Sequence, residues 1–185
     1  MAEMGKQPYM IGAQIMSTQS LLRDLGLGDL QHELATTRRV LERVPEGHFS
    51  WKPHEKSMSV GRLANHIVEI VSWQTTILRT DELDIATMPP RSQAPTSRNE
   101  LLRAFDAGVT SVNDALEVVD EKDFGKPWTL RRGVNPIFTQ PRFIVFRSMG
   151  VSHMINHRAQ LCVYFRLLNV PVPQIYGPTA DDPEL

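Results

Sequence analysis

Four stretches of the chain place apolar residues at alternating spacings of three and four, which is the repeat of an amphipathic helix. They run over about residues 29–44, 59–79, 97–119 and 141–168. Segments with prolines, glycines and polar residues separate them, and the longest lies between the third stretch and the fourth. The pattern predicts an all-α four-helix bundle with a long crossover between the third and fourth helices.

Residues that favour helix ends stand at these boundaries. Asp29 is a candidate N-cap of the first helix, and the second helix is expected to begin near residues 57–59. Ser97, with Glu100 three residues later, forms a capping-box motif at the start of the third. Asn169 is the expected C-terminal cap of the fourth.

The length of 185 residues favours a single domain. Residues 1–28 predict an N-terminal extension with a helical turn near residues 17–24, and residues 29–185 form the expected bundle domain. The crossover is expected to be a structured loop with short extended pieces. The proline-rich segment 170–185 is expected to lie as a strap along the surface.

Composition argues against several classes of protein. Twenty Lys and Arg against 21 Asp and Glu leave no basic excess for nucleic-acid binding. A single cysteine excludes an intramolecular disulfide framework and fits a cytoplasmic location. No apolar run reaches the roughly 18 residues of a membrane span, so no membrane partner is expected.

Three of the six histidines fall on the apolar faces of predicted helices. On a wheel of about 100° per residue, His153 and His157 lie one turn apart inside the apolar arc of the fourth helix. His66 occupies a core position of the second helix, between Leu63 and Ile70. All three imidazoles therefore point toward the bundle interior.

Two interpretations of these histidines are open. Each can be an ordinary core residue, but burying three imidazoles is costly, and no carboxylate lies on the apolar faces to pair with them. A divalent metal would use all three at once and leave open positions for water or substrate. Met154 stands where a zinc metalloprotease helix carries its general base, so we reject that class of enzyme.

The remaining candidates have simpler explanations. His32, His48 and His54 are expected on the surface or in a loop. Cys162 falls on the opposite side of the wheel from His153, so it is expected to be an unreactive thiol facing away from the site.

Several segments resemble the DinB-like family of damage-inducible and thiol-transferase proteins. They are WKPHEKSMSVGRLANH over residues 51–66, KPWTL over 126–130 and HMINHRAQL over 153–161, which continues to Pro178. The resemblance covers about residues 29–182. It implies a four-helix bundle, frequent homodimers, and a metal held by a histidine triad that maps onto His66, His153 and His157.

The resemblance also implies a reaction class. Some members transfer a low-molecular-weight thiol such as bacillithiol, mycothiol or glutathione to an electrophile. We therefore expect a cytoplasmic protein that binds zinc or nickel and acts on a small molecule, as a metal- and thiol-dependent S-transferase. A non-catalytic stress-response or ligand-binding protein with a structural metal, and a metal-dependent hydrolase, are the alternatives.

Overall fold

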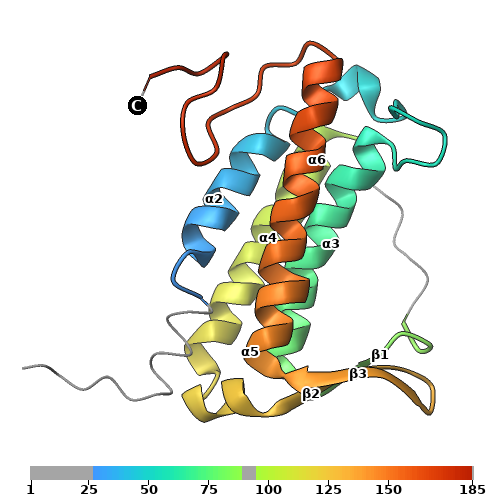
Figure 1. The fold of residues 1–185 in the computed structure, drawn as a ribbon, viewed down its shortest axis with the longest axis vertical. Coiled ribbons are helices and arrows are strands. Elements are labelled where there is room, and N and C mark those ends of the chain that lie inside the picture. The colour runs from blue at the N-terminus through green and yellow to red at the C-terminus, as the bar shows by residue number, and fades with distance from the viewer. Residues whose placement is uncertain (1–26, 89–94, 185) are drawn as a thin grey trace, which may run out of the picture.

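Four long helices lie side by side in the computed structural model, which describes residues 27–88 and 95–184 (Figure 1). They are α2 (Leu30–Leu41), α3 (Val60–Arg79), α4 (Arg98–Val118) and α6 (His153–Leu167). The predicted four-helix bundle is therefore present. The helical turn expected near residues 17–24, and nearly all of the extension over residues 1–28, lie outside the described residues.

Side chains cap two of the helices as expected. The Ser59 hydroxyl accepts a hydrogen bond from the backbone N–H of Arg62, and that of Ser97 accepts one from Glu100. The Glu100 carboxylate bonds the backbone N–H of Thr96 instead of Ser97, so only half of the capping box forms. The Asp29 side chain makes no capping bond.

The fourth helical stretch contains an irregularity that the wheel did not anticipate. It begins as α5 (Arg142–Val145), continues as a π-helical segment (Phe146–Ser152), and only then becomes α6. The extra residue per turn rotates the chain just before His153. Asn169 ends this stretch with a positive φ of 55°, in the left-handed conformation of a C-terminal cap.

The prediction of an all-α fold is wrong, because three strands form a sheet at one end of the bundle (Figure 1). Strands β1 (Glu82–Asp84), β2 (Pro127–Arg132) and β3 (Asn135–Pro141) pair in the order β1-β2-β3. The crossover supplies the antiparallel hairpin β2–β3, which turns at Gly133 with a φ of 59°. The linker after α3 supplies β1, which pairs with β2 in parallel.

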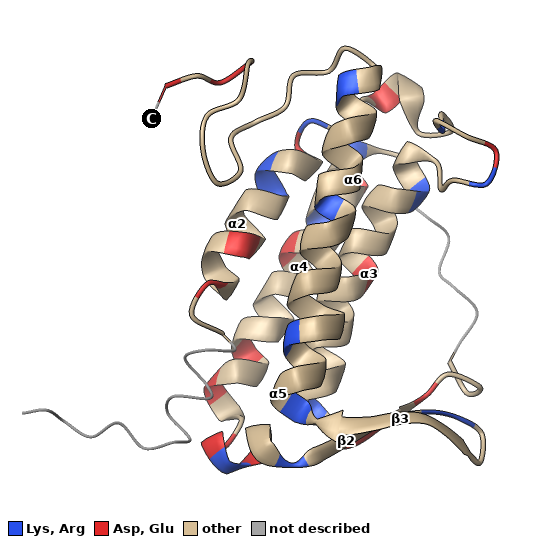
Figure 2. Cartoon of the chain, viewed as in Figure 1, with Lys and Arg blue, Asp and Glu red and all other residues tan. Residues whose placement is uncertain are grey.

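Charges hold β1 in place. Arg131 on β2 donates to Glu82 at 2.6 Å and to Asp84 at 2.6 Å, both on β1. Figure 2 shows that basic and acidic residues both occur at this end of the bundle. The Asp84 carboxylate also accepts a bond from the backbone N–H of Gly133, and this contact lowers the pKa of Asp84. Since β1 is only three residues long, these bonds compensate for its short ladder.

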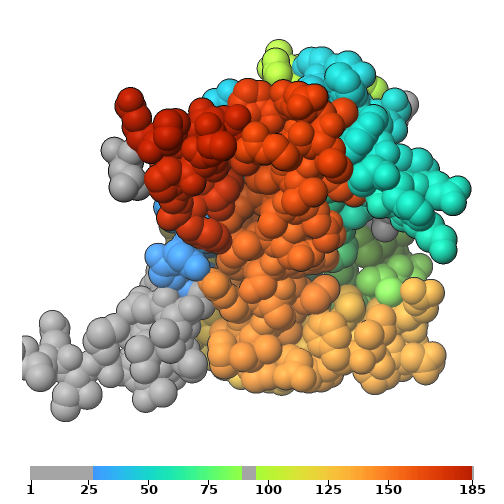
Figure 3. All heavy atoms as spheres, turned by 45° about the horizontal axis from the view of Figure 1, so that its top comes forward, coloured from blue at the N-terminus to red at the C-terminus, as the bar shows by residue number. Residues whose placement is uncertain are grey.

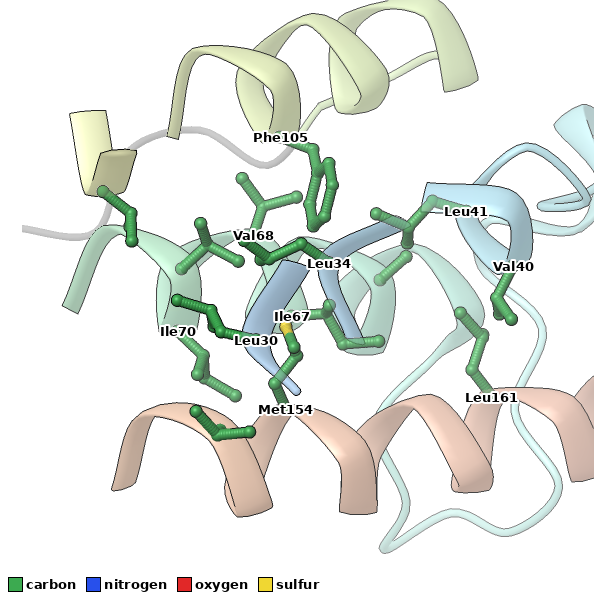
Figure 4. Packing of buried hydrophobic residues seen from close by; sticks show 14 of the residues in the cluster. Leu30, Leu34, Val40, Leu41, Ile67, Val68, Ile70, Phe105, Met154 and Leu161 are labelled. Atoms are coloured by element: carbon green, nitrogen blue, oxygen red, sulfur yellow. The ribbon is translucent and has the colours of Figure 1, made fainter. Parts of the chain in front are cut away.

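The core runs along the bundle axis. Leu34 of α2, Ile67 of α3, Phe105 of α4 and Met154 of α6 are all buried and converge there (Figure 4). Each helix thus buries its apolar stripe against the others, the arrangement that the three-and-four spacing predicts.

One ion pair is also buried, between Glu33 of α2 and Arg158 of α6. Their side chains are 3% and 1% exposed, and Arg158 Nη1 lies 2.6 Å from Glu33 Oε2. That contact falls outside hydrogen-bond geometry, so it is chiefly electrostatic. The Tyr176 hydroxyl bonds both partners, which fastens the C-terminal segment to the bundle surface (Figure 3).

Among the described helices, none combines the length and the apolar character that a membrane span requires.

Candidate metal centre

The three predicted histidines meet in one cluster. His66 comes from α3, and His153 and His157 come from the first turns of α6. The ring centroid of His66 lies 5.2 Å from that of His153 and 4.8 Å from that of His157. The Nε2 atoms of His153 and His157 are 2.9 Å apart, and one ligand atom from each of the three rings lies within 4.8 Å of the others.

A carboxylate that the sequence analysis did not identify orients the first of these rings. Glu69 Oε2 lies 3.1 Å from His66 Nδ1, one helical turn along α3. Because a carboxylate is an acceptor, it fixes the proton of His66 on Nδ1 and leaves Nε2 free to bind a metal. The expectation that no carboxylate pairs with the histidines is therefore wrong.

Glu69 is itself held by two neighbours on the same helix. Asn65 Nδ2 donates to its Oε1 at 2.9 Å, and Arg62 Nη1 donates to its Oε2 at 3.2 Å. Both carboxylate oxygens are therefore used in orienting interactions. The spacing of three between His66 and Glu69 is the signal that could have revealed this contact from the sequence.

A second orienting contact involves His157. Its Nδ1 lies 2.9 Å from Gln160 Oε1, again three residues along the helix. With Nδ1 donating to this oxygen, Nε2 of His157 carries a lone pair and faces Nε2 of His153. In His66 and His157, therefore, Nδ1 is hydrogen-bonded to a side chain of the same helix, and Nε2 is left to bind a metal.

Burial favours the neutral form of two of the three rings. Burial lowers the pKa of His66, although the hydrogen bond to Glu69 opposes that change. Burial also lowers the pKa of His153, and a positive charge on His157 or on His66 would lower it further. Neutral imidazole is the form that binds a metal ion, so burial favours the binding form of His66 and His153.

The spacing of the two histidines on α6 fits a divalent transition metal. Two nitrogens bound to one ion at about 2.0–2.1 Å lie about 2.9 Å apart at a right angle and about 3.3 Å apart at a tetrahedral angle, and the two Nε2 atoms are 2.9 Å apart. Nδ1 of His153 is buried and has no hydrogen-bond partner. With His157 Nε2 as the acceptor, a neutral His153 carries its proton on Nε2, and if both Nε2 atoms bound a metal that proton would lie on Nδ1.

Within the described part of the chain, the only cluster of this kind comprises these three side chains. The other histidines, His32, His48 and His54, are exposed as expected. Trp73 of α3 was not identified as a site residue from the sequence. Its ring lies 6.1 Å from that of His66 and 6.4 Å from that of His153, so it forms one wall of the centre.

Comparison with known proteins gives one family. A sequence model of the DinB family matches residues 16–184. A DinB-like protein from Bacillus cereus ATCC 10987 superposes with a TM-score of 0.61 and 20% identity, over 82% of this chain and 95% of that chain. A DinB-like protein from Bacillus subtilis superposes with a TM-score of 0.59 and 18% identity, over 80% of this chain and 96% of that chain. No curated protein sequence matches the chain.

Proposed function

Because the chain belongs to the DinB family, we propose that it is a divalent-metal-binding protein whose metal takes part in small-molecule chemistry, by transfer of a thiol to an electrophile. The observation that carries the proposal is the convergence of three imidazoles, two of them oriented by hydrogen bonds at Nδ1. Three nitrogen ligands suit zinc or nickel and leave positions for an exchangeable ligand.

The burial of the site supports a catalytic metal over a purely structural one. All three histidines are partly exposed, and the His66 side chain keeps 13% of its surface accessible. Structural metal sites are usually closed by four protein ligands, whereas this cluster supplies three. A small molecule can therefore reach the position that the imidazoles face.

The proposed reaction is the displacement of a leaving group by a thiol. A carbon–sulfur bond forms, the bond from carbon to the leaving group breaks, and the thiol proton leaves with the released group. A bound divalent cation lowers the pKa of a coordinated thiol, so that the thiolate forms near neutral pH. The sulfur comes from a cosubstrate, since burial raises the pKa of Cys162 and makes that thiol a poor nucleophile.

The chain's own residues hold and shield this chemistry. His66, His153 and His157 bind the cation, Glu69 fixes the tautomer of His66, and Trp73 excludes water from one side of the site. Hydrolysis is less well supported, because among the described residues no free carboxylate stands beside the cluster to take a proton from a metal-bound water. The nearest carboxylate, Glu69, is already bonded by three donors on α3.

Elemental analysis of protein purified without a histidine tag tests metal binding directly. We expect about one zinc or nickel per chain, and none in the triple variant His66→Ala, His153→Ala, His157→Ala. The matched control is the triple alanine variant of the exposed His32, His48 and His54, which should retain the metal. Equal metal content in both variants would contradict the proposal.

The reaction class needs a separate assay. Glutathione and 1-chloro-2,4-dinitrobenzene are suitable probes, because the thioether product absorbs and one chloride is released for each bond formed. We expect metal-dependent turnover that the variant of the three clustered histidines lacks. If chelation lowers the melting temperature strongly and no thiol reacts, the metal is structural. We also propose that the protein forms a homodimer and that its substrate is a small molecule.

A further inference from the structure

An apolar pocket of about 180 Å³ lies between the sheet and the end of the bundle. Leu83 and Ile85 line it from β1 and the residue after it, and Leu130 and Phe138 line it from β2 and β3. The bundle contributes its other wall, which includes Trp73 on α3. The pocket therefore exists only because the sheet covers this end of the helices.

The lining offers nothing for a charged ligand to bind. Nine of its ten residues are apolar or aromatic, and the exception is Thr76. The hydroxyl of Thr76 is bonded to the backbone carbonyl of Ser72, and the indole N–H of Trp128 is bonded to Thr80. With these polar groups already paired, the pocket favours an uncharged apolar group.

The volume limits the size of that group. An engineered protein cavity of about 150 Å³ binds benzene and stays dry when empty. A pocket of 180 Å³ therefore holds one aromatic ring with a short substituent, or an aliphatic group of the same size. Two tryptophans and a phenylalanine in the lining favour stacking against a ring.

The pocket adjoins the histidine cluster through two residues. Trp73 lines the pocket, and its ring also lies 6.1 Å from His66 and 6.4 Å from His153. Met149 lines it too, one turn before His153 on the same helical stretch. A molecule in the pocket is thus separated from the cluster by no more than the Trp73 side chain.

We propose that this pocket binds the apolar part of the electrophile on which the metal centre acts, a small uncharged compound with an aromatic ring or an aliphatic group of that size. The assignment to the electrophile rests on the proposed function. The binding of an apolar group in the pocket rests only on its lining and volume.

The test is a titration with trifluorotoluene followed by ¹⁹F NMR, on the metal-free protein and on the protein loaded with zinc or cobalt. We expect saturable binding in all three forms. We also expect additional broadening of the bound signal in the cobalt form only, because cobalt is paramagnetic and the pocket adjoins its site. Benzoate, which carries a charge, should bind at least tenfold more weakly.

Variants on the two faces of the sheet locate the binding. Leu130→Trp fills the pocket and should weaken trifluorotoluene binding at least tenfold. Leu83→Phe serves the same purpose if the first variant does not fold. The control is Ile137→Trp, which adds the same ring on β3 at a position that is 52% exposed and should leave binding unchanged.

Three results would overturn the inference. They are non-saturable binding to the wild type, undiminished binding in both pocket-filling variants, and saturable binding without cobalt-dependent broadening. The last result would separate the pocket from the metal. Failure to bind any metal would instead contradict the proposed function, and the titration of the metal-free protein measures the pocket independently of that outcome.

Discussion

Removing the negative charge of Glu69 should weaken metal binding although Glu69 is not itself a ligand. Its Oε1 accepts from Asn65 at 2.9 Å, and its Oε2 accepts from Arg62 at 3.2 Å and from His66 at 3.1 Å. In Glu69→Gln one of these two oxygens becomes an NH₂ group. That group is a donor, so at least one contact becomes donor against donor.

The size of the effect follows from the role of the hydrogen bond to His66. Partners that orient a metal-binding histidine typically contribute about 10- to 100-fold to metal affinity. This corresponds to roughly 1.4–2.7 kcal/mol of binding free energy. We expect Glu69→Gln to fall in this range and Glu69→Ala to reach its upper end, because alanine removes both acceptors.

Competition with a chromophoric chelator measures the affinity for zinc and nickel, and circular dichroism checks that each variant is folded. Glu117→Gln is the control, since it makes the same chemical change at an exposed position on α4. If both Glu69 variants bind metal as tightly as the wild type while His66→Ala does not, the orienting role assigned to Glu69 is refuted.

Three further predictions concern the protein around the site. Arg158→Met or Glu33→Gln alone should lower the free energy of unfolding by about 3–5 kcal/mol, since each leaves a buried charge unpaired. In urea denaturation, the double variant should lose much less free energy of unfolding than the sum of the losses in the two single variants. Gly150→Ala should cost about 1–3 kcal/mol in the same assay, because the added Cβ would lie 2.9 Å from Cγ of the fully buried Gln74. Burial raises the pKa of Cys162, so less thiolate is present at pH 8 than in an exposed cysteine. Iodoacetamide should therefore alkylate the native protein more slowly than the urea-unfolded chain, and equal rates would contradict this.

Residue patterns within single helices accounted for most of what the sequence predicted correctly. The spacing that defines each apolar face also placed His66, His153 and His157 toward the interior, and the structure brings them together. Glu69 was overlooked because only the apolar face was searched for partners, although its position three residues from His66 is a local signal.

Two features of the helices have no local signal in the sequence. Glu33 and Arg158 are usually surface residue types, and nothing local indicates that two helices bury them together. The π-helical segment before His153 contains Gly150, where Gln74 leaves no room for a side chain, and the sequence does not reveal that neighbour.

The sequence by itself determined the four helices and the three histidines of the cluster, because helical periodicity is a property of neighbouring residues. Only the tertiary structure decided that the linker and the crossover form a sheet. Strand β1 pairs with β2 across 47 positions, from Glu82 to Thr129. Because β1 is only three residues long, its sequence pattern is too short to predict that partner. The apolar pocket beside the histidines follows from that pairing, so the shape of the proposed substrate site is set by contacts that no local pattern encodes.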